Sequence, residues 1–198
     1  MQQDLTAYID AANAAVSEFD LEIRSALPQK SSSSGQQQTN DQQHVFALVN
    51  TTSDPLMQLA TTYSADEIAF VKRLLDAMFD THNTSRLEAM VVSATQAIQL
   101  GRTTESSSRQ ESTGGGTIQS LSMTQAESVL KSLVQEGWLE VSRKGYYSLT
   151  PRALMELRGW LVTMYNEAGE TPKIKFCAAC REIITVVSGV FWSCISVL

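Results

Sequence analysis

The chain has 198 residues, of which 43% are hydrophobic and 18% are charged, as expected of a soluble globular protein with one large or two small domains. Residues 1–137 carry eight Lys or Arg against sixteen Asp or Glu, whereas residues 138–198 carry seven against five. The first two thirds therefore lack the clustered basic face that strong non-specific nucleic-acid binding requires, which favours protein partners.

The first 80 residues predict a small helix and hairpin unit. A helix over about residues 5–19 precedes two strand-like runs, residues 21–27 and 45–49, in which apolar residues alternate or are β-branched. The Ser- and Gln-rich residues 30–43 between the runs predict a long polar loop at the tip of a hairpin. We interpret residues 1–80, including the helix that follows, as a first winged-helix-like domain.

Two helix starts carry the pattern of a capping box, in which a Ser or Thr and a Glu three residues later satisfy each other's backbone amides. The first runs from Ser64 to Glu67 and the second from Thr124 to Glu127, and Gly137 provides the stop for the second helix. Apolar residues follow the first box at helical spacing, and they are Ile68, Val71, Leu74, Leu75, Met78 and Phe79.

A second winged-helix domain is predicted over residues 81–170, with a flexible Ser- and Gly-rich insertion at 101–117. After Gly137, two short strands flank a turn at residues 143–145, and Thr150 and Pro151 then open a long helix as cap and first helical residue. The fold class is thus mainly α with small β wings (α+β): tandem winged helices followed by an incomplete RING-like zinc module at residues 171–198.

The predicted metal ligands are Cys177 and Cys180, because a C-x-x-C pair has the spacing of a zinc ligand pair. A structural zinc ion needs four ligands; the histidines, His44 and His82, lie far upstream, and Cys194 is the one remaining cysteine. The alternative is two ordinary cysteines in an apolar stretch. The absence of a secretory signal pattern at the start favours a reducing compartment and metal use over a disulfide.

Several blocks together resemble one family. They are LVNT at 48–51, QLATTYSADEI at 58–68, EGWL at 136–139, GYYSLTPRALMEL at 145–157 and IKFCAAC at 174–180. In their order and spacing they are similar to the non-structural maintenance of chromosomes element 1 family. The resemblance implies a nuclear subunit of the five/six-type structural-maintenance-of-chromosomes complex, active in DNA repair and recombination, that pairs with a melanoma-antigen-type subunit and adjoins the kleisin.

The same resemblance implies a C-terminal RING that makes the subunit a ubiquitin ligase. A RING docks a ubiquitin-charged conjugating enzyme and forms no covalent intermediate, so we expect no catalytic residue and no cofactor other than zinc. A RING needs further Cys and His pairs after Cys180, whereas residues 186–198 contain only Cys194. We therefore expect an incomplete zinc site, an inactive ligase half, and a truncated product or mis-spliced gene model from about Val186 onward.

Two alternatives from other classes stay open. A DNA-binding regulator would need a basic recognition helix, yet residues 124–136 carry only Lys131 against Glu127 and Glu136. For Arg143 and Lys144 of the predicted wing, one interpretation is weak contact with DNA and the other is a turn whose charges are simply solvated. A non-catalytic scaffold would bind the same partners whatever the state of its zinc module. No membrane partner is expected, because the uncharged residues 183–198 are too short to span a bilayer.

Overall fold

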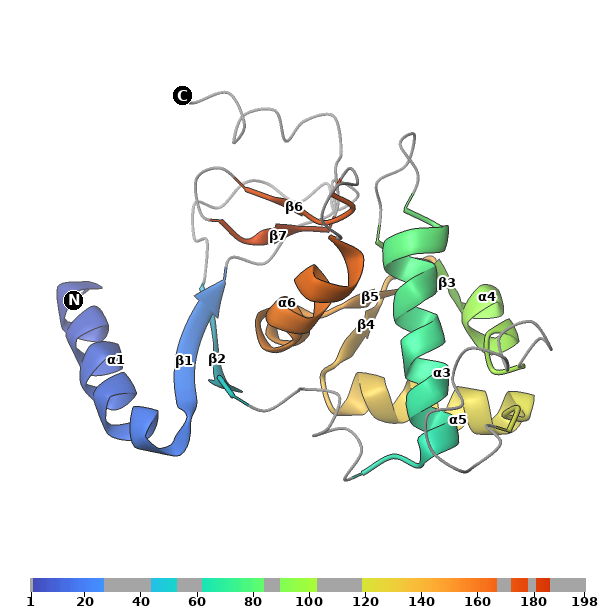
Figure 1. Ribbon diagram of the computed structural model, residues 1–198, viewed down its shortest axis with the longest axis horizontal. Coiled ribbons are helices and arrows are strands. Elements are labelled where there is room, and N and C mark those ends of the chain that lie inside the picture. The colour runs from blue at the N-terminus through green and yellow to red at the C-terminus, as the bar shows by residue number, and fades with distance from the viewer. Residues whose placement is uncertain are drawn as a thin grey trace.

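The computed structural model describes residues 2–26, 44–52, 62–83, 90–102, 119–166, 172–177 and 181–185. Within these ranges helices and small antiparallel sheets mix, which confirms the predicted α+β class (Figure 1). The polar loop at 30–43, most of the insertion at 101–117, and Cys180 lie outside the described residues. No helix in the described ranges is long and apolar enough to cross a membrane.

The N-terminal part is a helix followed by a hairpin. Helix α1 (Gln2–Val16) continues into a short 3-10 helix, η1 (Ser17–Phe19), and strands β1 (Leu21–Ala26) and β2 (Val45–Asn50) pair antiparallel. Asp20 has φ 58°, a left-handed conformation that an aspartate tolerates and that turns the chain into β1. The predicted hairpin is confirmed, and Figure 1 shows it between α1 and the later helix α6.

Helix α3 (Ala65–Asp76) begins at the predicted capping box. The Ser64 hydroxyl accepts from the Glu67 amide, and the Glu67 carboxylate accepts from the Ser64 amide at 2.8 Å. The helix continues into a π-helical turn, η2 (Ala77–Thr81). The predicted apolar stripe is buried from Val71 to Phe79, while Ile68 packs partly buried against the same core.

The next elements complete a winged helix. Strand β3 (Val92–Ser93) leads into α4 (Ala94–Gln99), and then follow α5 (Met123–Gln135), β4 (Leu139–Val141) and β5 (Tyr146–Leu149). The strands form one antiparallel sheet in the order β3-β5-β4, and the β4–β5 turn is the wing predicted from the sequence. Together with α3 the order is helix, strand, helix, helix, strand, strand, which is that of a winged helix.

One predicted cap is wrong. Helix α5 starts two residues earlier than the Thr124–Glu127 pattern indicates: Ser122 is the cap, its hydroxyl accepts from the Gln125 amide, and Gln125 bonds back to the Ser122 amide. Both patterns satisfy the capping-box spacing. The earlier one prevails because it places Leu121, at the position before the cap, in the core.

Helix α6 (Pro151–Tyr165) starts as predicted, with Thr150 as cap and Pro151 in the first turn. A second small hairpin follows, in which β6 (Lys175–Phe176) pairs antiparallel with β7 (Ile183–Ile184). Ile174 and Ile183 are both buried in the cluster that contains α3, α5 and α6. The second hairpin therefore shares the core of the winged helix.

Two apolar clusters hold the described parts together. The large one joins α3, η2, β3, α4, α5, the wing sheet, α6 and the second hairpin, so α3 packs with elements that follow residue 80. The small one joins Ala26, Ala47 and Val49 of the first hairpin to Met155 of α6. The predicted domain divisions at residues 80 and 170 stay predictions, and the packing places α3 in the core of the later winged helix.

Candidate zinc hairpin and interaction face

The first predicted zinc ligand, Cys177, lies directly after β6 at the end of the second hairpin and is buried. Its amide donates to the carbonyl of Glu182 at 2.9 Å, and its carbonyl accepts from the amide of Arg181 at 2.8 Å. Arg181, which follows Cys180 in the sequence, adopts the left-handed φ of 58°. These two bonds hold Cys177 next to Arg181 and Glu182.

Polar side chains attach the segment leading into this hairpin to the winged helix. Asn166, which follows α6, receives the Ile174 amide on its side-chain oxygen at 2.9 Å and donates to the Ile174 carbonyl at 3.0 Å. Asn83 donates to the Lys173 carbonyl at 3.0 Å, and the Lys173 ammonium contacts the Asp80 carboxylate at 2.6 Å. The hairpin is therefore fixed to the ends of both α6 and η2.

Two further contacts hold the other side of the hairpin. The Thr185 carbonyl, after β7, accepts from the Met90 amide at 3.1 Å. Arg158 of α6 donates to the Arg181 carbonyl at 2.8 Å and lies over the Phe176 ring, 5.4 Å from its centroid. A single arginine thus contacts both the strand and the turn that surround Cys177.

Beneath the hairpin, a buried tyrosine links α6 to α3. The Tyr165 hydroxyl donates to the Asp76 carboxylate at 2.7 Å, and its ring stacks on Phe79 with centroids 5.3 Å apart. Burial, reinforced by the bond to Asp76, raises the pKa of the Tyr165 hydroxyl well above its usual value, so it stays a neutral donor. This bond positions the end of α6 from which the hairpin departs.

The described residues supply one donor of the predicted zinc site, Cys177. A thiolate pair at this spacing suits zinc; Cys177 is fixed by its bonds to Glu182 and Arg181, whereas Cys180 lies outside the described residues. Across the described ranges no cluster of three or more His, Cys, Asp and Glu side chains could hold a metal ion. The chemistry of the pair therefore fits zinc, and the described residues do not complete a four-ligand site.

The first hairpin and α1 present an exposed apolar face. On β2, Ala47 and Val49 point into the small cluster against α6, so Phe46 and Leu48 point the opposite way and Leu48 is 53% exposed. Phe19, in η1, and Tyr8, on α1, are further exposed apolar side chains of this N-terminal part, and Tyr8 is 74% exposed. Large apolar side chains that gather on adjacent elements mark an interaction surface.

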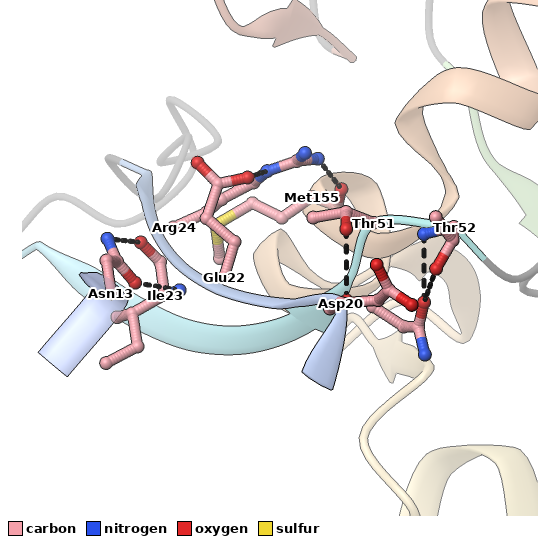
Figure 2. A network of polar contacts seen from close by, with 9 residues as sticks. Asn13, Asp20, Glu22, Ile23, Arg24, Thr51, Thr52 and Met155 are labelled. Atoms are coloured by element: carbon pink, nitrogen blue, oxygen red, sulfur yellow. Dashed lines mark hydrogen bonds and ion pairs between the residues drawn. The ribbon is translucent and has the colours of Figure 1, made fainter. Parts of the chain in front are cut away.

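Polar contacts hold α1 and the hairpin in this arrangement (Figure 2). The Asn13 side chain of α1 accepts from the Ile23 amide at 2.6 Å and donates to the Ile23 carbonyl at 3.2 Å. At the other end of β1, the Asp20 carbonyl accepts from the Thr51 amide at 2.8 Å and from its hydroxyl at 3.0 Å. The exposed face therefore rests on a fixed backbone.

The surface that binds DNA in many winged helices has no basic character here. On α5, Lys131 is exposed together with Glu127 and Glu136, so the helix carries no net positive face. Arg143 and Lys144 are also exposed, but they lie at the wing and add no positive charge to α5 itself. Trp138 is buried under the Arg152 guanidinium, which lies 5.2 Å from the ring centroid.

The fold and these surfaces define a winged-helix protein with a cysteine-bearing hairpin docked on its core and an apolar face at its N-terminal end. The family model described as the Nse1 non-SMC component of the SMC5-6 complex matches residues 1–157. The chain therefore belongs to the Nse1 family, which confirms the resemblance seen in the sequence.

Curated relatives agree. Proteins named non-structural maintenance of chromosomes element 1 homolog are 22% identical over 138 residues in Xenopus laevis, covering 70% of this chain and 42% of the relative. The Homo sapiens relative is 22% identical over 145 residues, which cover 73% of this chain and 46% of the relative. The Rattus norvegicus relative is 21% identical over 180 residues, which cover 91% of this chain and 55% of the relative. The chain spans about half the length of these relatives.

A solved structure entitled Nse1-Nse3-Nse4 complex contains a chain of the same fold. The TM-score is 0.64 at 18% sequence identity, and the match covers 94% of this chain and 66% of that chain. The likeness thus extends over nearly all of the sequence.

The sequence indicated Cys177 as a candidate zinc ligand but did not indicate the side chains that hold its hairpin in place. Asn83, Asn166 and Arg158 belong to no motif, and their roles depend on contacts between distant parts of the chain. Strand β3 and helix α4 were also not predicted, although Ser93 and Gln96 form a capping box that the sequence pattern could have indicated. The predicted pair of Cys177 and Cys180 stays a prediction.

Proposed function

We propose that this chain is the Nse1-type subunit of an SMC5-6 complex and that it assembles with a melanoma-antigen-type subunit and a kleisin subunit. The observation that carries the proposal is the match of the Nse1 family model to residues 1–157. The likeness to a chain of the Nse1-Nse3-Nse4 complex and the exposed apolar face of Tyr8, Phe46 and Leu48 support the partner assignment.

Within that complex we assign the chain to the nucleus and to DNA repair and recombination. The assignment rests on the family. The winged helix contributes by protein contact: the outward side of α5 carries Glu127, Lys131 and Glu136, a charge balance that gives DNA phosphates no net attraction.

We further propose that Cys177 and Cys180 are the first zinc ligand pair of a RING-type module through which a ubiquitin-charged conjugating enzyme is docked. Bound zinc would cross-link the turn between β6 and β7. In this chain Asn166 and Asn83 fix the segment before β6, and Arg158 fixes Arg181 before β7, relative to the winged helix. The supports are in position whether or not further ligands complete the module.

Co-expression with the melanoma-antigen-type subunit of the same organism tests the assembly. Copurification as a one-to-one pair is expected, and a chain that elutes alone would contradict it.

Zinc content and discharge of ubiquitin from a charged conjugating enzyme test the second proposal, with Cys177→Ser as the variant. Loss of bound zinc in Cys177→Ser is expected, and equal zinc content in both chains would exclude Cys177 as a ligand.

A non-catalytic scaffold is the second candidate function. The family match to residues 1–157 and the exposed apolar side chains of the N-terminal part support it, because neither involves the cysteine pair. The scaffold predicts full assembly with both partners and no ubiquitin discharge. Discharge above that of the conjugating enzyme alone would assign the ligase instead.

A further inference from the structure

Helix α1 has an apolar face that no other described element buries. Its half-buried residues recur at helical spacing on the side toward β1, and they are Ile9, Ala12, Asn13 and Val16. Leu5 and Tyr8, one helical turn apart, are 49% and 74% exposed, and Ala15 is exposed two turns after the tyrosine. Figure 1 shows the helix at the edge of the molecule, on the far side of β1 from α6. We call the exposed Leu5, Tyr8 and Ala15 the α1 face.

The charges around the α1 face are all negative. Residues 1–23 contain five Asp or Glu and no Lys or Arg. Three of these acidic side chains, Asp10, Glu18 and Asp20, are exposed, and within the described residues none of the three forms an ion pair with a Lys or Arg. The N-terminal helix therefore carries an uncompensated negative charge beside exposed apolar side chains.

Two of these carboxylates lie at the end of the helix where negative charge is least favourable. The last turn of a helix carries partial negative charge, which Lys or Arg side chains stabilise. The last turns of α1 and η1 contain no basic residue, and Glu18 and Asp20 stand there instead, on either side of the 71% exposed Phe19. Thr51 fixes the backbone at Asp20 (Figure 2). A cation supplied from outside the chain would remove this local repulsion.

We propose that the α1 face docks a basic amphipathic helix of a partner protein. The apolar side of that helix covers Leu5 and Tyr8, and its Lys or Arg side chains pair with Glu18 and Asp20. At 1.5 Å per residue, the axial distance from Tyr8 to Asp20 is about 18 Å, so about three turns of a partner helix span both ends of the surface. An arginine at the far end would also lie within reach of the exposed Phe19 ring.

The negative charge disfavours the other partners that an exposed apolar helix can have. Nucleic acid and anionic membrane surfaces both present negative charge, which the acidic residues of α1 and η1 repel. A second copy of the chain would bring the same five carboxylates against them. A cationic protein segment is the partner that matches both the apolar and the charged part of the surface. Which subunit supplies this segment rests on the proposed function.

The apolar part is tested with the full chain and two synthetic helical peptides that share the same leucine positions. One carries lysine at its polar positions and the other glutamate, and the lysine peptide is expected to bind at least about tenfold more tightly. Tyr8→Ser should weaken the lysine peptide about tenfold, whereas the control Met164→Ser, at an exposed methionine of α6, should leave its binding within about twofold. Equal effects of the two substitutions would overturn the proposal.

The charged part is tested by a double variant, Glu18→Gln with Asp20→Asn. Asparagine tolerates the left-handed backbone conformation of Asp20, so the substitution removes the charge and keeps the fold. The lysine peptide should bind this variant about tenfold more weakly at low salt, and the difference should shrink at about 0.5 M salt. The control, Glu127→Gln with Glu140→Gln, removes the same charge from α5 and the wing. Equal losses in the two double variants would show general attraction to an acidic chain and overturn the proposal.

Photo-crosslinking identifies the partner segment in the assembled complex. With p-benzoylphenylalanine in place of Tyr8, the chain co-expressed with the melanoma-antigen-type and kleisin subunits should cross-link to a segment of one of them that has more Lys and Arg than Asp and Glu. A cross-link to a second copy, to a segment without net positive charge, or to neither subunit of an assembled complex would overturn the proposal.

The two arms separate this proposal from the proposed function. If the subunits assemble with the chain while the lysine peptide binds all variants alike, the α1 proposal fails and the assembly stands. If the subunits do not assemble while the variants discriminate as expected, the assembly fails and the α1 proposal stands.

Discussion

At the scale of single residues, Glu156 of α6 is a carboxylate that is only 9% exposed. Its partner is Arg152, at 3.6 Å, and the arginine also donates to the Glu136 carbonyl and covers Trp138. Burial raises the pKa of the Glu156 carboxyl, and the nearby Arg152 charge opposes that rise without cancelling it. The ionised form is therefore less favourable in the folded chain than in the unfolded one.

Glu156→Gln is expected to raise the free energy of unfolding at neutral pH by about 1 kcal/mol, because the neutral amide avoids burying a charge. A raised folded-state pKa means that the folded chain binds the proton more tightly, so stability from this group is complete below the ordinary glutamate pKa and is lost as the pH rises through the folded value. The gain in Glu156→Gln should thus vanish in acid. Denaturant unfolding at several pH values measures it.

The exposed Glu127→Gln is the control for that series and should change the unfolding free energy by less than about 0.5 kcal/mol at every pH. A Glu156→Gln chain that is less stable than the original at neutral pH would show that the ion pair with Arg152 outweighs the cost of burial.

Tyr165→Phe removes the donor to Asp76 while keeping the ring on Phe79. Asp76 is exposed, so water can replace the lost donor, and we expect a destabilisation of about 1 kcal/mol, the typical net worth of one hydrogen bond. Tyr146→Phe, at an exposed tyrosine on the wing, is the control and should be nearly neutral. Thermal unfolding of the two variants compares them, and equal melting temperatures would contradict the role of the Asp76 bond.

At the scale of elements, local signals predicted much of the structure and failed where distant contacts decide. The caps at Ser64 and Thr150 and the stop at Gly137, with φ +76°, follow from neighbours in the sequence. The start of α5 does not follow from its neighbours in the sequence, because two overlapping capping boxes compete there and the burial of Leu121 selects between them.

Ser122→Ala and Thr124→Ala separate the two caps. Ser122→Ala removes the side-chain bond to the Gln125 amide and should destabilise the chain by about 1 kcal/mol. Thr124→Ala lies inside the first turn and should cost less than about half of that, although the Thr124 hydroxyl contacts that of Ser122 at 3.1 Å. Denaturant unfolding measures the loss of stability in each variant. A larger loss in Thr124→Ala than in Ser122→Ala would restore Thr124 as the cap.

The cysteine hairpin shows the same limit of sequence reasoning. The C-x-x-C spacing predicts a zinc ligand pair, and the structure places Cys177 directly after β6, bonded to Glu182 and Arg181. Its attachment to η2 and α6 could not be predicted, because Asn83 and Asn166 resemble any loop asparagine until the fold brings the Lys173 and Ile174 backbones to them. The same applies to α3, whose core partners on α5 lie more than 50 residues later in the chain.

At the scale of the whole molecule, the described residues of the N-terminal part join the winged helix through a small apolar cluster. Met155 packs against Ala26, Ala47 and Val49, and Arg24 bonds to the Met155 carbonyl. The opposite side of the hairpin exposes Leu48. An apolar side chain that contributes little to the fold and lies on a fixed backbone is available for a partner.

Leu48→Asp should therefore leave the stability of the isolated chain within about 0.5 kcal/mol and abolish copurification with the melanoma-antigen-type subunit, since a buried unpaired charge is costly at an interface. The control is Val141→Asp, at an exposed valine of the wing, which should leave copurification intact. If both variants copurify normally, the hairpin face is not the contact.

The most direct test of the central claim is the mass of the particle formed when the chain is co-expressed with the melanoma-antigen-type and kleisin subunits of the same organism. Size-exclusion chromatography with light scattering should give one species whose mass equals one copy of each subunit. A chain that elutes at its own mass of 21.7 kDa, apart from a complex of the other two, would contradict its assignment as the Nse1-type subunit of that assembly.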